Sequence, residues 1–218
     1  LIERHGRLTL SGALPIIEDV LGALCAASPT GGPCHAGIWP DAILLDYDGR
    51  AKLGQFGRRL FADELGEFTL SPRGTVTGPA FYVAPEQLAD PAAGDVRSDL
   101  YMLGCTLYET LSGSVPFDGQ SAEEVLAARL GVRPPALAAA VPEMPAEVSV
   151  FVGRLMGTRP EDRPASAQEA LAALRDLAKS LSGRLLVAAA RSPFRSPYGE
   201  TAVARASRLR AALWTALG

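Results

Sequence analysis

The sequence is poor in the residues that build disulfide-linked domains and metal sites. Its 218 residues include three cysteines and two histidines. The neighbours Cys34 and His35 are not followed by a second pair at zinc-ligand spacing, and His5 has no such partner either. Three thiols without a disulfide framework suit a reducing compartment. We therefore expect neither a disulfide scaffold nor a metal site.

The sequence also lacks a strong charge of one sign and a long apolar run. Its 21 basic and 24 acidic residues leave a formal net charge of −3, which offers no electrostatic footprint for nucleic acid. We recognise no secretory-signal pattern in these residues, and the longest apolar candidate, residues 185–190, is far shorter than the roughly 18–20 residues of a membrane span. We expect a cytoplasmic protein, with association to a membrane-bound assembly as the open alternative.

What the chain does have is enough apolar material for one main domain. Hydrophobic residues make up 48% of the sequence and charged residues 21%. A chain of this length and composition can bury a sizeable core.

Residues 35–57 form the most informative segment, HAGIWPDAILLDYDGRAKLGQFG. It resembles the catalytic loop and metal-binding segment of eukaryotic-like Ser/Thr protein kinases. These read H-R-D-[LI]-K-P-x-N-[IV]-L-L and, about ten residues later, K-[LI]-x-D-F-G. The resemblance continues in order through residues 78–87 (GPAFYVAPEQ), 95–119 (DVRSDLYMLGCTLYETLSGSVPFDG) and 159–171 (RPEDRPASAQEAL). Four ordered blocks make coincidence a poor explanation.

The resemblance implies that the reacting side chains have been replaced. Gly37 stands at the family's catalytic Asp and Trp39 at its phosphate-contacting Lys. Ala42 and Gln55 stand at the two magnesium ligands, an Asn and an Asp, and neither is a carboxylate. We therefore predict a pseudokinase, without enzymatic activity, bound metal or cofactor.

The resemblance also implies which residues keep the architecture. Asp99 corresponds to an Asp that accepts backbone donors of the catalytic loop, since a buried carboxylate needs such partners. Glu86 and Arg163 correspond to a buried ion pair that joins the activation segment to the last helices. His35 and Phe56 match two members of the family's hydrophobic spine. All five are structural candidates.

The fold class that follows is mainly α. We expect a protein-kinase-like C-terminal lobe over residues 1–181, helical with a short β-hairpin region, then a linker at 182–200 and a tail helix at 201–218, with the N-terminal lobe absent. Residues 46–49, DYDG, predict a β-turn between short strands. Apolar spacings of three and four predict two buried helix stripes: Leu14, Ile17, Leu21 and Leu24, and Leu100, Leu103, Leu107 and Leu111.

The tail carries a further apolar stripe. Its candidates for partner binding are Leu209, Leu213, Trp214 and Leu217. Three interpretations stay open: a helix that folds back on the lobe, a helix that docks in a partner's groove, and a helix that makes weak contact with a membrane surface.

Two functions remain in consideration. The first is a non-enzymatic binding or scaffold module that works with protein partners in a larger assembly. The second is a degenerate phosphotransferase that uses relocated acids such as Asp41, Asp46 or Asp48. In the activation-segment equivalent, Ser71, Thr75 and Thr77 are loop hydroxyls that phosphorylation could modify.

Overall fold

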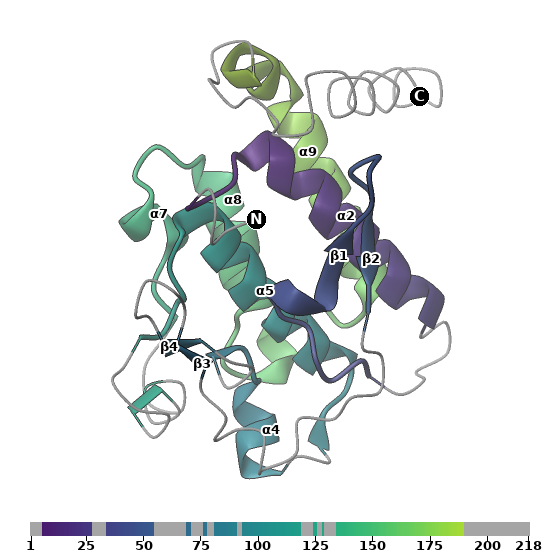
Figure 1. The fold of residues 1–218 in the computed structure, drawn as a ribbon, viewed down its shortest axis with the longest axis vertical. Coiled ribbons are helices and arrows are strands. Elements are labelled where there is room, and N and C mark those ends of the chain that lie inside the picture. The colour runs from purple at the N-terminus through teal and green to yellow at the C-terminus, as the bar shows by residue number, and fades with distance from the viewer. Residues whose placement is uncertain are drawn as a thin grey trace.

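The structure is a computed structural model. It describes residues 6–27, 34–54, 69–70, 76–77, 81–90, 93–118, 124–125, 128 and 134–189. The elements in these ranges are α2 (Leu10–Ala27), η1 (Pro40–Ala42), β1 (Ile43–Leu45), β2 (Ala51–Leu53), β3 (Thr69–Leu70), β4 (Val76–Thr77), α4 (Pro85–Ala89), α5 (Val96–Ser112), α7 (Leu137–Ala140), α8 (Ala146–Leu155), η4 (Pro160–Asp162) and α9 (Ala167–Ala189). Helices dominate, and the strands form two antiparallel pairs, β1 with β2 and β3 with β4 (Figure 1).

Helix α5 is the centre of the fold. Asp95 caps its start by accepting the N–H of Arg97 at 2.7 Å, and Gly113 ends it in the left-handed conformation, at φ 82°. The sequence predicts one buried stripe, but every residue from Ser98 to Leu111 except Glu109 is buried. A helix covered on all sides is a core helix.

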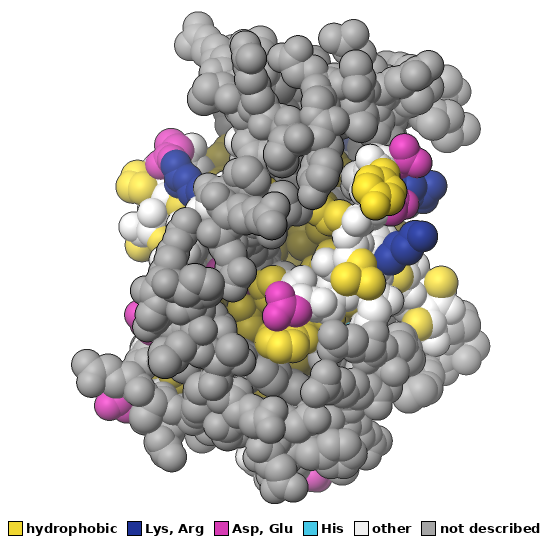
Figure 2. Space-filling model, viewed as in Figure 1, with side chains coloured by type: hydrophobic (Ala, Val, Ile, Leu, Met, Phe, Trp, Pro, Cys, Tyr) yellow, Lys and Arg dark blue, Asp and Glu magenta, His cyan; other side chains and the backbone are white. Residues whose placement is uncertain are grey.

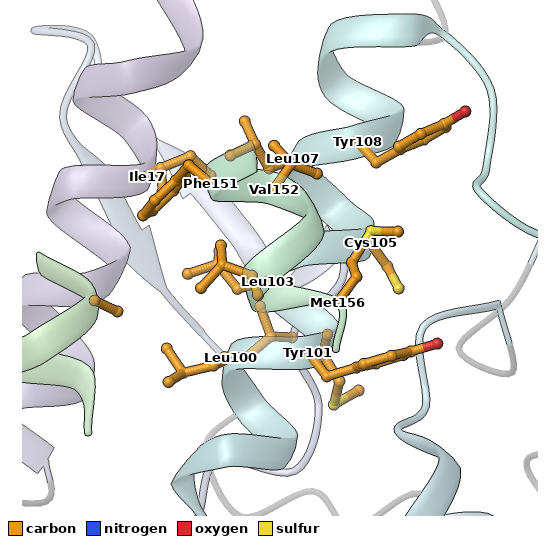
Figure 3. Packing of buried hydrophobic residues seen from close by; sticks show 14 of the residues in the cluster. Ile17, Leu100, Tyr101, Leu103, Cys105, Leu107, Tyr108, Phe151, Val152 and Met156 are labelled. Atoms are coloured by element: carbon orange, nitrogen blue, oxygen red, sulfur yellow. The ribbon is translucent and has the colours of Figure 1, made fainter. Parts of the chain in front are cut away.

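Helices α2, α8 and α9 provide that cover. Helix α2 packs against α9, α5 and β2, and α8 packs against α5 and α9. Ile17 of α2, Leu103 of α5 and Val152 of α8 point into the same cluster (Figure 3). Each fully buried leucine or isoleucine contributes about 1.5–3 kcal/mol relative to an exposed one. The four predicted core residues of α2 are all buried: Leu14, Ile17, Leu21 and Leu24.

Close approach between α5 and α8 depends on a glycine. A Cβ on Gly104 would lie 2.9 Å from Cβ of Leu155 and 2.8 Å from Cγ of Met156. Distances below 3.0 Å do not occur for real Cβ atoms without a shift of the neighbours. Gly104 therefore sets how closely α5 meets the end of α8.

The predicted hairpin is formed by β1 and β2, with Leu44 opposite Lys52. Asp46 Oδ1 closes its turn by accepting the N–H groups of Asp48 at 3.0 Å and Arg50 at 2.9 Å. On its other edge, β2 is tied to α2, because Asp19 Oδ2 accepts the N–H of Ala51 at 2.9 Å. The hairpin is thus fixed to the helical core.

Two features of the helices differ from the sequence-based expectation. Helix α9 continues to Ala189, beyond the boundary expected at residue 181. In the described part of the chain, α2 has the length and composition to cross a membrane, which core helices of soluble proteins share. Here α2 packs on its neighbours, and Arg175 of α9 binds Glu18 of α2 at 3.0 Å.

The described surface is not uniformly polar. Leu44, Tyr47 and Val150 are its exposed large hydrophobic residues. In the view of Figure 2, hydrophobic side chains gather around a hollow near the centre, and an acidic side chain lies among them.

Candidate functional site

One buried carboxylate holds the loop that leads into the first hairpin. Asp99, in the first turn of α5, is 1% exposed. Its Oδ2 accepts the backbone N–H of His35 at 2.7 Å, and its Oδ1 accepts that of Ala36 at 2.8 Å. Ala36 has a φ of 59°, in the left-handed region that costs a non-glycine residue roughly 1–2 kcal/mol. The two charge-assisted hydrogen bonds offset that strain.

The pKa of Asp99 reflects two opposing influences. Burial raises it to about 7, and the charge of Asp95 acts in the same direction. The N–H groups of His35 and Ala36 lower it, because they favour the ionised carboxylate. The anchor of the loop therefore titrates near neutral pH.

His35 ties the same loop to the end of β2. Its Nε2 lies 2.8 Å from the carbonyl oxygen of Gly54, which can only accept, so Nε2 carries the proton. Burial lowers the pKa of His35, while the hydrogen bond to Gly54 raises it, and the net change is downward. The buried, neutral ring thus connects the loop to the hairpin.

The replaced family positions fall inside this loop. Gly37 and Ala42 are buried, so the loop offers no carboxylate or amide at either place. Trp39 is half-buried and packs edge-on against Tyr82, with ring centroids 6.4 Å apart and planes at 61°. Gln55 lies outside the described residues.

Glu86 and Arg163 form the expected ion pair, in which Arg163 is buried and Glu86 is partly buried. Nη1 of Arg163 lies 2.6 Å from Oε1 of Glu86, and Nη2 lies 2.8 Å from Oε2. The arginine also donates to the carbonyl oxygens of Gly157, Arg97 and Thr158, at 2.7, 2.9 and 3.1 Å. All five guanidinium N–H donors are therefore used. The pair joins the start of α4 to the segment between α8 and α9.

The ion pair with Arg163 changes the pKa of Glu86. Burial raises it, but the hydrogen bonds from Arg163 and Ser98 outweigh burial and hold the pKa below its usual range. Ser98 Oγ donates to Glu86 Oε1 at 2.6 Å. The carboxylate is thus satisfied from two elements.

Tyr82, which packs on Trp39, also binds an acidic side chain of α5. Tyr82 donates its hydroxyl hydrogen to Oε2 of Glu109 at 2.5 Å. Burial raises the pKa of Glu109, and the negative charge of Asp41 raises it further, against the hydrogen bond from Tyr82. The pKa of Tyr82 is likewise raised by burial first and then by the Glu109 and Asp41 carboxylates. Trp39, Asp41, Tyr82 and Glu109 form what we call the loop cluster.

The three relocated acids differ in what they can do. Asp46 accepts two backbone N–H groups of the hairpin turn, and Asp48 is exposed in the same turn. Asp41 lies in η1, directly after Trp39 and Pro40, and its side chain is exposed. Of the three, Asp41 belongs to the loop that Asp99 anchors.

Comparison with known sequences identifies the family. Residues 1–174 match the family model described as the protein kinase domain. The chain belongs to the protein kinase family. Among its relatives, the serine/threonine-protein kinase PknL of Mycobacterium tuberculosis is 34% identical over 182 residues, 84% of this chain and 44% of PknL. PknH of Mycobacterium bovis, another serine/threonine-protein kinase, is 35% identical over 173 residues, 79% of this chain and 28% of PknH.

A solved structure supports the fold. A crystal structure of Rad53 1–466 in complex with AMP-PNP matches with a TM-score of 0.59 and 23% identity, covering 78% of this chain and 41% of that one. At this identity the likeness concerns the fold alone. The chain has a helix-rich protein-kinase-like fold with short two-stranded sheets, and it spans less than half the length of the curated relatives it matches.

The prediction that the chain is not an enzyme is wrong. The protein kinase domain match and the relatives named as serine/threonine-protein kinases point to an enzyme. The prediction assumed that base and metal ligands must stand at the family positions of Gly37, Ala42 and Gln55.

The family implies a nucleotide and magnesium ions. The described residues do not fit the family's metal site, since the buried methyl group of Ala42 supplies no oxygen ligand. Within the described ranges, no three acidic, histidine or cysteine side chains are grouped so that they could hold a metal ion. The loop cluster supplies carboxylate, hydroxyl and indole groups instead.

Sequence reasoning did not single out Tyr82 and Glu109. Both fall inside recognised kinase motifs, at residues 78–87 and 95–119. Their pairing links two segments that the sequence separates by 27 positions, and only the fold brings them together. The available signal was the tyrosine in the motif at residues 78–87, for which a hydrogen-bond partner could have been expected.

Several predicted residues lie outside the described part of the kinase chain. They are Gln55, Phe56, Ser71, Thr75, Leu209, Leu213, Trp214 and Leu217. The linker and tail-helix assignments, and the tail's role in partner or membrane contact, stay predictions.

Proposed function

We propose that this chain takes part in phosphoryl transfer to a hydroxyl group of a protein substrate, as the C-terminal-lobe part of a Ser/Thr protein kinase. In this proposal Asp41 is the relocated acid. Support comes from the family and from the names of the relatives, which are serine/threonine-protein kinases. Because the chain spans less than half of those relatives, the activity is proposed for the whole protein that contains it.

The observation that carries the proposal is the anchored loop with an exposed carboxylate on it. Asp99 fixes His35 and Ala36 through two short hydrogen bonds. The N–H of Ala42 donates to the carbonyl oxygen of Trp39 at 3.0 Å, which closes η1 around Asp41. A general base works only when its position is fixed relative to the reacting group.

Asp41 can accept the proton that the substrate hydroxyl loses. In the transfer, the hydroxyl oxygen forms a bond to the phosphorus of a nucleoside triphosphate. The bond from that phosphorus to the bridging oxygen breaks, and the diphosphate leaves with the electron pair. The substrate proton moves to Asp41 Oδ. Asp46 is the weaker candidate, because its Oδ1 accepts two N–H groups that hold it in the hairpin turn.

The test is phosphate incorporation by the full-length protein. Radiolabelled ATP, divalent cations and a generic Ser/Thr protein substrate are supplied, and Asp41→Asn is compared with Asp48→Asn. Loss of a general base typically costs about 10²- to 10⁴-fold in rate. We expect Asp41→Asn to lose at least about 100-fold and Asp48→Asn to keep the wild-type rate. Equal rates for wild type and Asp41→Asn would overturn the role of Asp41, and no incorporation by wild type would overturn the activity.

The substrate would also be the protein partner that the sequence analysis expects. The exposed side chain of Asp41 is accessible to such a protein segment. The cytoplasmic location belongs to this proposal, since an intracellular nucleoside triphosphate is the phosphoryl donor.

A further inference from the structure

Helix α8 exposes an apolar stripe on the side that faces away from the core. Its core side packs on the neighbouring helices with four buried residues: Val148, Phe151, Val152 and Leu155. On the opposite side Val150 is 71% exposed, and Ala146 and Gly153, about one turn before and after it, are exposed as well. Spacings of four and three place these residues on one face of the helix. The described residues leave this stripe uncovered.

Nothing in the described structure requires a glycine at position 153. A Cβ built there has no atom within 4 Å, and Gly153 is not among the glycines with a positive φ. Glycine in the middle of a helix is less stable than alanine, because it loses more backbone freedom on folding. At Gly104, by contrast, the missing Cβ lets α5 approach the end of α8. Gly153 would allow the same close approach by a helix from outside the chain.

The charged residues beside the stripe suit a second copy of α8. Glu147 precedes Val150 by three positions and Arg154 follows it by four, and both are exposed along the same edge of the stripe. In an antiparallel pair with a two-fold axis near Val150, Glu147 of one copy lies level with Arg154 of the other, at both ends of the contact. A parallel pair would place each charge level with its own copy instead.

Arg154 also has the capacity for a second carboxylate. Its Nη2 donates to Oε1 of Glu169 in the first turn of α9. A guanidinium group has five N–H donors, so this bond leaves donors for Glu147 of another copy. The existing bond holds the arginine side chain at the edge of the stripe, where the second acid would arrive.

We infer that the exposed face of α8 is an interface between two copies of this chain. Val150 of each copy packs on the other, Gly153 allows the backbones to approach, and the two Glu147–Arg154 pairs fix the antiparallel register. One face of a ten-residue helix, roughly 15 Å long and 10 Å wide, is smaller than the roughly 800 Å² per partner of a standard interface. The association is therefore weak and depends on concentration. It depends neither on Asp41 nor on phosphoryl transfer.

The first experiment is sedimentation-velocity ultracentrifugation of the 218-residue chain over concentrations from about 1 to 500 µM. Reducing agent prevents the three free cysteines from linking copies. We expect a monomer–dimer equilibrium with a Kd of roughly 10–500 µM, the range of a small, weak interface. A chain that stays monomeric over the whole range would overturn the inference.

Charge complementation then tests the antiparallel pairing. Glu147→Arg places like charges opposite one another in its own dimer, and so does Arg154→Glu, so each variant alone should dimerise at least roughly 10-fold more weakly than wild type. In an equimolar mixture both pairs join opposite charges, and dimerisation should return. Lys52→Glu, which reverses an exposed charge on the hairpin, should dimerise as wild type. Single variants that dimerise as tightly as wild type, or a mixture no more dimeric than its components, would contradict the pairing.

Gly153→Ala separates the interface from the stability of the helix. The added methyl group has room inside one chain but lies between the two backbones of the dimer. We expect a monomer that is more stable to urea and a dimer that is roughly 3- to 10-fold weaker. A dimer as tight as wild type would refute the close approach at Gly153. Circular dichroism spectra of each variant confirm that a lost dimer is not a lost fold.

Discussion

Replacing Arg163 by lysine should destabilise the chain far more than its conservative character suggests. Arg163 is completely buried and makes five hydrogen bonds, two to Glu86 and three to backbone carbonyl oxygens. Its guanidinium carbon also lies 4.8 Å from the centre of the Tyr101 ring. Lysine keeps the charge but has three donors on one nitrogen, so at least two bonds to buried acceptors are lost.

The magnitude follows from these losses. Each buried acceptor left unsatisfied costs about 1–3 kcal/mol, so Arg163→Lys should lower the free energy of unfolding by roughly 2–5 kcal/mol. Arg163→Met leaves Glu86 without its counter-ion and should cost about 3–5 kcal/mol. The double variant Glu86→Gln with Arg163→Met should not return to wild-type stability, because the carbonyl oxygens of Gly157, Arg97 and Thr158 lose their donor in either case.

The assay is urea unfolding followed by far-ultraviolet circular dichroism at neutral pH. The control is Arg154→Lys, because Arg154 pairs with Glu169 at the surface, with side chains 45% and 42% exposed. Such a pair contributes about 0–1 kcal/mol. If Arg163→Lys unfolds within about 0.5 kcal/mol of wild type, the five-donor account of the pair is refuted.

Two further predictions concern packing and pH. Gly104→Ala should lower the free energy of unfolding by roughly 1–2 kcal/mol, because overpacking against Leu155 and Met156 costs about 1–3 kcal/mol and helix propensity returns up to about 1 kcal/mol. Gly153→Ala lies on the exposed side of α8, with no atom within 4 Å of the new Cβ, and should raise the free energy of unfolding by about 0.5–1 kcal/mol. Urea unfolding that ranks the two variants the other way would contradict the packing account. Burial raises the pKa of Asp99 to about 7 from an ordinary 3.8, so the folded state binds the proton more tightly than the unfolded state does. The free energy of unfolding should therefore fall as pH rises from about 4 to 7 and level off above 7. Asp99→Asn should lower stability at every pH and remove that slope, and a slope that persists in the variant would assign it to another group.

Much of the fold followed from local patterns. Apolar spacing predicted the buried face of α2, and the DYDG segment predicted the hairpin turn, where Asp46 accepts two N–H groups of the turn itself. These features depend on residues within a few positions of one another, which is why the sequence is sufficient for them. The long-range pair of Glu86 and Arg163 came from the family resemblance, not from spacing.

The site was harder to predict, because its members come from distant segments. Sequence reasoning concentrated on what Gly37, Ala42 and Gln55 had lost, and it concluded that no enzyme remained. It could not rank Asp41, Asp46 and Asp48, since all three are aspartates near one another in the chain. Packing separates them: turn donors occupy Asp46, whereas Asp41 stays exposed on the anchored loop.

The family, the main helices and the hairpin can be predicted from the residues alone, because hydrophobic periodicity, turn residues and ordered motifs are local properties of a chain. Tertiary structure alone decided that Trp39 packs on Tyr82, that Tyr82 bonds to Glu109, and that neither Asp41 nor Glu109 has a cationic partner in the described ranges. These are contacts across 27 or more positions, and a contact between such distant residues exists only when the core of α5 brings their segments together.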